Sequence, residues 1–166
     1  MKVRDANDRD PSAVTNVDET FRILAIDYGR KRIGLALSDE LGLTAQPLAI
    51  IERSNRHTDM RRLREICREK RVTRVLVGHP VHLTGAASEM AEEAARFAAR
   101  LAKECGIPTE LADERLTSWE AKQLLSHAKS RRPRNAPIDD LAAAMILRDY
   151  LDANRNHGRA AAARKA

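Results

Sequence analysis

Residues 21–38 read FRILAIDYGRKRIGLALS, and this stretch decides the fold. Its apolar runs, Ile23–Ile26 and Ile33–Leu37, have the length and β-branched character of buried strands. A short connection containing Gly29 joins them, and glycine readily adopts the positive φ that tight turns require. The stretch therefore predicts a β-hairpin, with Asp27 at the end of its first strand.

Asp27 is an unusual residue to follow a hydrophobic strand. A carboxylate there costs free energy unless it is hydrogen-bonded, paired or bound to a cation. One interpretation is an Asx turn, in which the side chain satisfies the nearby backbone. The other is a metal-binding carboxylate, and the remaining acidic residues of the chain must decide between the two.

The length and composition of the chain limit the classes of protein to which it can belong. Its 166 residues suit one domain with a substantial core. No apolar run reaches the roughly 20 residues of a membrane span, and the charged N-terminus is unlike a signal peptide. Cys67 and Cys105 lack metal-ligand spacing and are expected to be buried free thiols. We therefore expect a cytoplasmic protein that does not contact membranes.

The formal net charge of +6 is unevenly distributed along the chain. Residues 1–20 hold three basic and five acidic side chains, residues 153–166 hold four basic and no acidic ones, and residues 21–152 hold 23 basic and 19 acidic ones. A basic balance favours polyanionic partners such as nucleic acid. We expect a disordered leader at 1–20, a single domain over 21–152 and a basic disordered tail at 153–166.

The order of the expected elements restricts the fold. After the hairpin, hydrophobic periodicity predicts strands over 46–52, 74–77 and 108–112, and helices over 56–70, 88–105, 117–126 and 139–152. Gly106 is expected to end the second of these helices in the left-handed conformation. Successive hairpin strands followed by strand–helix alternation predict an α/β fold, with a mixed five-stranded sheet flanked by helices.

Acidic residues stand at the ends of three of these elements. Asp27 ends the first strand, Asp113 and Glu114 end the last strand, and Asp139 and Asp140 begin the final helix. Each has an ordinary structural role available, such as capping a helix or pairing with an arginine. If the first and last strands are parallel neighbours, however, the fold brings these acids together, and they could not all stay ionised without a compensating charge.

Mg²⁺ or Mn²⁺ would supply that charge, because both prefer oxygen ligands. Two such ions about 4 Å apart activate water and stabilise the leaving oxygen in phosphodiester hydrolysis. Three or four of these acids, gathered at one edge, therefore predict a metal-dependent site. Neighbouring strand residues point to opposite faces, so only one of Asp113 and Glu114 should face Asp27, and alternation alone does not say which.

Several motifs of the chain resemble, in the same order, those of the YqgF (RuvX) family. They are AIDYG at 25–29, RIGLA at 32–36, VGHP at 77–80, DERLTS at 113–118 and ID at 138–139. The resemblance spans about residues 21–152 and implies a ribonuclease H-like fold. It also implies a nuclease that matures the 5′ end of the small-subunit (16S) ribosomal RNA precursor, similar to Holliday-junction resolvases.

The resemblance also assigns roles to individual residues. It implies that Asp27 and Asp139 are metal-binding catalytic acids, and that Glu114 or Asp113 is the third, with Glu114 ranked first. Arg115 would contact a phosphate. Further nucleic-acid contacts are expected from basic residues of two loops, namely Arg30, Lys31, Arg131, Arg132 and Arg134.

Other functions are compatible with parts of the sequence. A resolvase of four-way DNA would favour a symmetric dimer, whereas processing one RNA end would not require it, so a monomer and a homodimer both remain open. A non-catalytic RNA-binding module would use the acids structurally, but the chain has few aromatic residues for base stacking. The first hairpin also resembles that of actin-like ATPases, which need two such domains. We expect precursor rRNA as the substrate rather than a DNA junction, and ribosomal particles as candidate partners.

Overall fold

The computed structural model describes residues 22–79, 88–113, 123, 126–127, 129–133 and 136–163, with the backbone alone for 157–163. The predicted leader at 1–20 lies outside the described residues, as does the start of the helix predicted over 117–126. Residues 126–127 and 129–130 are helical, so helical structure continues slightly past the expected end at Ser126.

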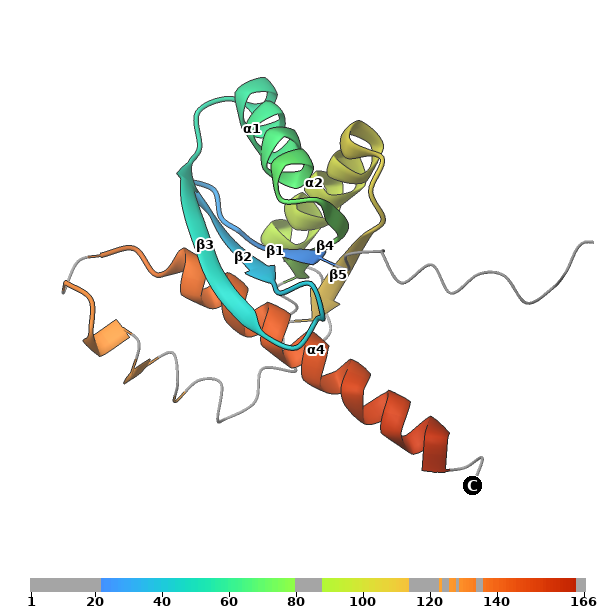
Figure 1. Cartoon of the computed structure of the whole chain (residues 1–166). Helices are drawn as coiled ribbons and strands as arrows, with labels where there is room; N and C mark the ends of the chain where they lie inside the picture. The colour runs from blue at the N-terminus through green and yellow to red at the C-terminus, as the bar shows by residue number, and fades with distance from the viewer. Residues whose placement is uncertain are drawn as a thin grey trace, which may run out of the picture.

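A five-stranded sheet forms the centre of the fold, in the order β3-β2-β1-β4-β5 (Figure 1). The strands are β1 (Arg22–Tyr28), β2 (Arg32–Ser38), β3 (Ala45–Glu52), β4 (Val72–His79) and β5 (Thr109–Asp113). β1, β2 and β3 form an antiparallel meander, whereas β4 runs parallel to both β1 and β5. The predicted mixed sheet is confirmed. The first and last strands are not neighbours, because β4 lies between them, but their carboxyl ends still lie at the same edge.

The central strands are apolar because both of their faces are covered. Ile23–Ile26 of β1 and Ile33–Leu37 of β2 are buried throughout, as expected for strands between two layers. The edge strand β3 is more exposed and contains Pro47 beside a shift in its register with β2. An edge strand tolerates a residue that has no amide hydrogen to donate.

Two helices cover one face of the sheet, α1 (Arg56–Glu69) and α2 (Glu89–Cys105). The Asn55 side chain caps α1 by accepting a hydrogen bond from the Thr58 amide at 2.9 Å, and Ser88 caps α2 in the same way. Gly106 ends α2 in the left-handed conformation with φ of 67°, which confirms the sequence prediction. Most of the large apolar side chains pack between these helices and the sheet.

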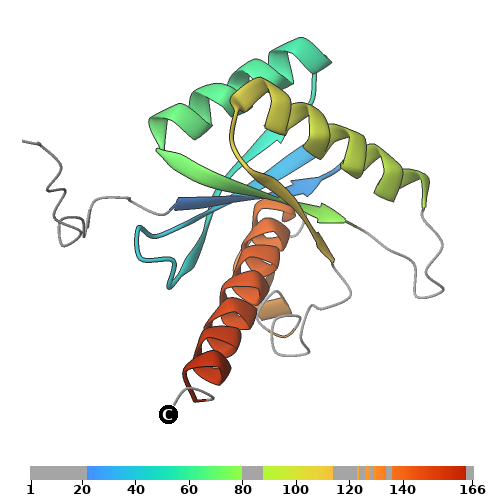
Figure 2. The same ribbon diagram turned by 90° about the vertical axis from the view of Figure 1, so that its right-hand side faces the viewer.

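Among the described helices, α4 (Asp139–Ala163) covers the opposite face of the sheet (Figure 2). The expected end at Asp152 is wrong, and so is the expectation of disorder for residues 153–163, because α4 continues to Ala163. The added segment is rich in alanine, which has the highest helix propensity of all residues. None of the described helices, α4 included, is long and apolar enough to cross a membrane.

Candidate active site

Asp27 lies on the face of the sheet that α4 covers. Ile23 and Ala25 pack with residues of α4, whereas Leu24 packs with the α1 and α2 layer. Because side chains alternate along a strand, Asp27 shares the α4 face with Ala25. Its Cα partner across the hairpin is Gly34 of β2, which therefore lies on the same face.

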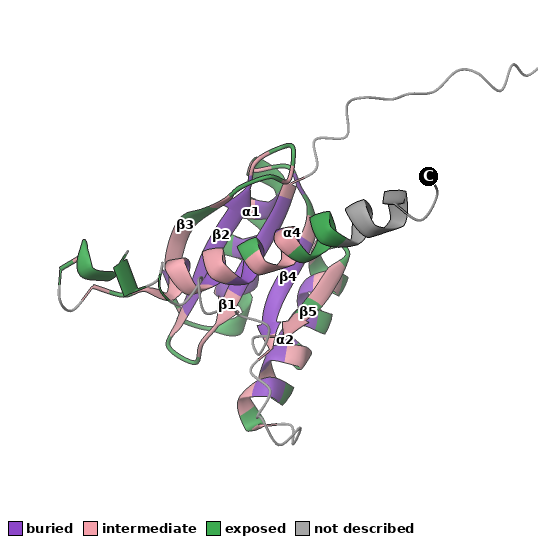
Figure 3. Ribbon diagram, turned by 90° about the horizontal axis from the view of Figure 1, so that it is seen from below, coloured by how far each residue is buried: buried purple, intermediate pink, exposed green. Residues whose placement is uncertain are grey.

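Gly34 allows the first residue of α4 to approach the sheet very closely. A Cβ atom at Gly34 would lie 1.9 Å from the backbone oxygen of Asp139 and 2.0 Å from its carbonyl carbon. These distances are far shorter than van der Waals contact, so the position has no room for a side chain. The neighbouring residues of this face, Ala25 and Ala36, are also small. The helix start is consequently seated on the cross-strand partner of Asp27, and the structure brings Asp27 and Asp139 together at one site. Figure 3 shows α4 lying across the buried central strands.

Arg32 is the residue of this site to which sequence analysis gave no role. Its Nε donates a hydrogen bond to Oδ2 of Asp139 at 2.9 Å, and both side chains are partly exposed. Arg32 stands two positions before Gly34, so it shares the face of α4. That spacing was the available signal, because residues two apart in a strand line one face.

Asp140, the next residue of α4, is held in a different way. Its carboxylate is buried and accepts two hydrogen bonds of 2.8 Å from the guanidinium of Arg132. Arg132 also donates to the backbone oxygen of Pro137, and its pKa is raised because it is bonded to Asp140. The pair therefore fixes the segment that leads into α4, while Asp139 faces the hairpin.

Asp113, the last residue of β5, lies on the other face of the sheet. Glu110 of the same strand reaches the α4 face, where Oε2 accepts a hydrogen bond from the Tyr150 hydroxyl of α4 at 3.3 Å. Asp113 is three positions further along, and alternation assigns it to the α1 and α2 face. The structure thus places Asp113 and Asp27 at the same edge but on opposite faces. Glu114 lies outside the described residues.

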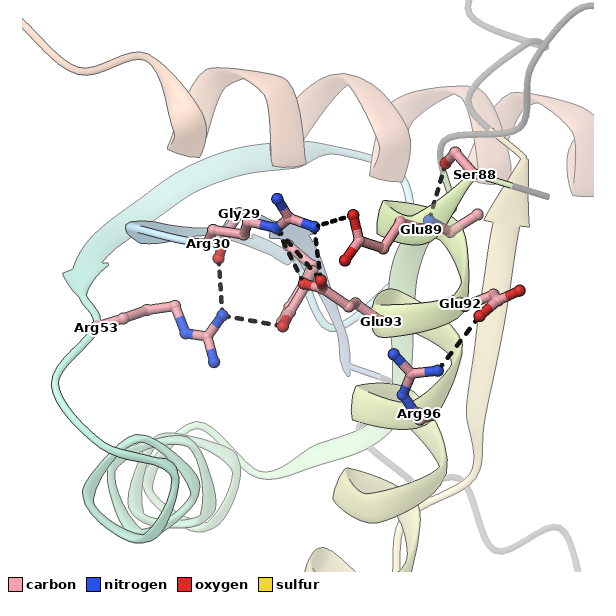
Figure 4. A network of polar contacts seen from close by, with 10 residues as sticks. Gly29, Arg30, Arg53, Ser88, Glu89, Glu92, Glu93 and Arg96 are labelled. Carbon is pink, nitrogen blue, oxygen red and sulfur yellow. Dashed lines mark hydrogen bonds and ion pairs between the residues drawn. The ribbon is translucent and has the colours of Figure 1, made fainter.

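Arg30, expected to contact nucleic acid, is engaged by two carboxylates of α2. It pairs with Glu89 at 2.9 Å and Glu93 at 2.8 Å, which ties the hairpin turn to that helix (Figure 4). Hydrogen bonds to Glu93 and Glu89 raise the pKa of Arg30, and the bond from Arg30 lowers the pKa of Glu93. The neighbouring Lys31 is exposed.

Of the other four arginines predicted to contact nucleic acid, the structure describes two. Arg131 is exposed, and Arg132 is bound to Asp140, as described above. Arg115 and Arg134 lie outside the described residues.

The described part of the site offers ligand atoms that suit a hard divalent cation. Asp27 and Asp139 offer carboxylate oxygens on one face, which are the ligands that Mg²⁺ and Mn²⁺ prefer. Within the described ranges, no three His, Cys, Asp or Glu side chains gather closely enough to complete a metal site. The two acids fit such an ion, and a third protein ligand would have to come from elsewhere in the chain.

Known proteins resemble this chain over most of its length. A sequence model of the RuvX family, described as Holliday junction resolvase, matches residues 21–153. The "Putative pre-16S rRNA nuclease" of Koribacter versatilis is 42% identical over 145 residues, covering 87% of this chain and 92% of the relative. The protein of the same description from Symbiobacterium thermophilum is 47% identical over 134 residues, covering 80% of this chain and 93% of the relative.

Solved structures support the fold independently. The structure of Thermus thermophilus RuvC in complex with a Holliday junction substrate matches with a TM-score of 0.56 and 15% identity, covering 81% of this chain and 96% of RuvC. At that identity the match concerns the fold alone, and it confirms the ribonuclease H-like architecture. The family model covers residues 21–153, and relatives are more than 40% identical in sequence to this chain. The chain therefore belongs to the RuvX family.

Proposed function

We propose that this protein is a divalent-metal-dependent nuclease that hydrolyses phosphodiester bonds in the cytoplasm. The observation that carries the proposal is the seating of α4 on Gly34, which puts Asp139 beside the strand pair that holds Asp27. Two acids far apart in sequence are thereby gathered on one face. Pairing with Arg32 would give Asp139 a structural role, but it would not account for the position of Asp139 beside Asp27.

The proposed residue roles follow from this arrangement. Asp27 and Asp139 bind Mg²⁺ or Mn²⁺, and a pair of such ions would activate water and stabilise the leaving oxygen. Arg32 orients the Asp139 carboxylate through its hydrogen bond, as groups around a metal ligand commonly do.

Glu114 is our choice for the third acid. Asp113 belongs to the α1 and α2 face, and continued alternation assigns the residue after it to the face of Asp27. Asp113 remains an alternative only if the chain turns there. Arg115 is proposed to contact a phosphate of the substrate.

For the substrate we propose the 5′ end of the precursor of 16S rRNA, free or within ribosomal particles. This proposal rests on the described activity of relatives that are 42% and 47% identical to this chain. A protein that trims one RNA end can act as a monomer or as a homodimer.

The test is cleavage of a 5′-extended 16S rRNA fragment with Mg²⁺ or Mn²⁺. We expect Asp27→Asn and Asp139→Asn each to slow cleavage by about 10³-fold or more, because each removes a ligand of the reacting centre. Binding of the RNA should largely persist. Asp152→Asn is the matched control, because Asp152 lies on α4 far along from the site and its ion pairs with described residues are exposed. Equal cleavage by the wild type and both active-site variants would reject the assigned site.

A second candidate is resolution of four-way DNA junctions, favoured by the description of the matching family. The same assay should offer a four-way DNA junction and the precursor RNA side by side. Cleavage of the junction alone would reverse our preference. If neither substrate is cut although the RNA is bound, the protein is a non-catalytic RNA-binding module.

A further inference from the structure

A cavity of about 200 Å³ lies between the end of β1, the start of α1 and the middle of α2. It is on the face of the sheet opposite α4, and Tyr28 and Phe97 contribute to its lining. Four arginines also line it, from three different parts of the chain: Arg53, Arg56, Arg96 and Arg100. We call this feature the arginine pocket.

Both acidic residues of the pocket lining are paired with arginines. Asp59 is buried and is paired with Arg53, whose guanidinium also donates a hydrogen bond to the Tyr28 hydroxyl at 2.9 Å. Glu93 is paired with Arg30 of the hairpin turn, which it shares with Glu89, and it also attracts Arg96 electrostatically (Figure 4). The lining nevertheless holds four arginines against two carboxylates.

The remaining arginines of the pocket carry a surplus of positive charge. Neither Arg56 nor Arg100 forms an ion pair with any residue that the structure describes. Within the described part of the chain, the ion pair of Arg96 is a long contact of 3.5 Å with the exposed Glu92, and Glu93 attracts it electrostatically. Arg96 and Arg100 are four positions apart on α2, so their side chains leave the helix on one face.

Guanidinium groups converging from several elements suit a phosphate group. Arginine presents a planar fork of donors that matches phosphate oxygens, and such charged hydrogen bonds are stronger than neutral ones. A volume of about 200 Å³ exceeds that of several water molecules, each of which occupies about 30 Å³ in the liquid, so a phosphate fits.

The pocket is also adjacent to the candidate active site. Tyr28, which lines it, directly follows Asp27, and the two residues point to opposite faces of the same sheet edge. A polynucleotide held at Asp27 and Asp139 could therefore place a neighbouring phosphate in the pocket by passing around this edge.

We propose that the arginine pocket binds a backbone phosphate of the nucleic-acid substrate, next to the phosphodiester that is cut. The proposal rests on the proposed nuclease function for its choice of ligand, but binding at the pocket requires neither the acids nor a metal. The two proposals can therefore fail separately.

The test measures equilibrium binding of the precursor RNA fragment to the full chain in EDTA, at several salt concentrations. The variant is Arg56→Gln combined with Arg100→Gln. We expect about tenfold weaker binding and a shallower dependence of log affinity on log salt, by about 0.7 for each phosphate of a single strand that the variant no longer neutralises. Arg96→Gln combined with Arg100→Gln should act in the same direction, and it covers the case in which the first pair does not fold.

The matched control is Arg64→Gln combined with Arg68→Gln. Both residues are exposed on α1, towards its other end, and the change in net charge is the same. The control should bind RNA within about twofold of the wild type. Equal losses in control and pocket variants would show a general charge effect and overturn the proposal, as would unchanged binding by the pocket variants.

A second arm separates a polynucleotide from a small anion. Inorganic phosphate and a nucleoside 5′-monophosphate should compete with RNA only at concentrations far above the RNA affinity. If the pocket variants lost binding of inorganic phosphate but bound RNA like the wild type, the pocket would serve a free anion instead. RNA binding through the pocket by a protein that cuts no substrate would keep this inference and reject the nuclease proposal.

Discussion

The two faces of the sheet are built differently although the same strands supply both. On the α1 and α2 face the strands present large side chains such as Leu24, Ile26 and Leu35, which pack with Phe97 and Leu101 of α2. On the α4 face the corresponding part of β1 and β2 presents Ala25, Gly34 and Ala36. One face therefore holds most of the core, and the other allows a helix to approach closely.

The contrast teaches that small residues can position a site as firmly as large ones build a core. Close packing leaves little room for error at the α4 face, because an added methyl group at Gly34 would overlap the backbone of Asp139. The acids depend on that contact for their proximity. On the α1 and α2 face, the buried apolar side chains and the Arg53–Asp59 ion pair stabilise the fold.

The broadest effect is expected from Gly34→Ala, because it should reduce both stability and catalysis. The start of α4 must move to accommodate the methyl group, at a cost of about 2 kcal/mol in the free energy of unfolding. Displacement of Asp139 should slow the proposed cleavage by about 100-fold or more. Denaturant unfolding and the RNA cleavage assay measure the two effects.

Ala36→Gly is the control for that change, because it removes a methyl group from the same face two positions away. It should cost about 1 kcal/mol through backbone entropy and reduced packing, with cleavage retained. Near-normal cleavage by Gly34→Ala would show that the seating of α4 does not position the acid.

Asp59→Ala tests the other face. Removing this buried carboxylate leaves Arg53 without its ion-pair partner and should cost about 3 kcal/mol of unfolding free energy. The affinity of the α4 face for Mn²⁺ should not change. Glu69→Gln, which removes an exposed pair with Lys70, should leave the unfolding free energy nearly unchanged, because water screens exposed ion pairs. A loss of Mn²⁺ affinity in Asp59→Ala would mean that the faces are not independent.

Asp139 and Asp140, the first two residues of α4, should differ in their effects on stability and on cleavage. Asp140→Asn breaks the bidentate contact with Arg132 and should cost about 2 kcal/mol of unfolding free energy. Asp139→Asn should cost less stability but abolish the proposed cleavage. Thermal unfolding and cleavage rates of the two variants, measured together, should show this reversal, and the opposite pattern would exchange the roles that we assign.

The smallest effect is expected from Arg32→Gln. Loss of the hydrogen bond to Asp139 should lower Mn²⁺ affinity or cleavage by about tenfold, as is typical for groups that orient a metal ligand. Arg32→Lys should restore part of the loss, since a lysine can still donate to the carboxylate. If Arg32→Gln bound Mn²⁺ as the wild type does and cleaved at the same rate, Arg32 would have no positioning role.

Much of this architecture could be predicted from sequence because it is expressed in local patterns. The hairpin, the left-handed cap at Gly106 and the mixed sheet followed from apolar runs, glycine and strand–helix alternation. The packing of the final helix across the edge where β1 ends was also expected, and the start of α4 lies there against Gly34. The expectation was made for β1 and β5 as parallel neighbours, whereas β4 lies between them.

Other features depend on contacts that no local pattern expresses. The role of Gly34 became apparent only once the backbone of Asp139 was placed against it. The pairing of Arg32 and Arg132 with successive acids of α4 likewise requires the tertiary fold. The predicted end of α4 at Asp152 is too early, because the charge of the basic segment that follows suggests a solvated tail, whereas its alanines favour helix.

The cysteines are a further example. Cys67 and Cys105 are free thiols, as predicted, although Cys105 is only partly buried. The fold brings both into one core cluster, and burial, with a smaller effect of Cys105, raises the pKa of Cys67 to about 12. Their separation in the sequence gave no sign of that proximity.

The most direct measurement is Mn²⁺ binding by calorimetry to the wild type, Asp27→Asn, Asp139→Asn and the double variant, with Asp152→Asn as the control. We predict that each single change weakens binding by at least tenfold and that the double variant loses much less than the product of the two, because both carboxylates hold the same ions. Wild-type affinity in Asp139→Asn, or fully independent losses, would contradict a shared site.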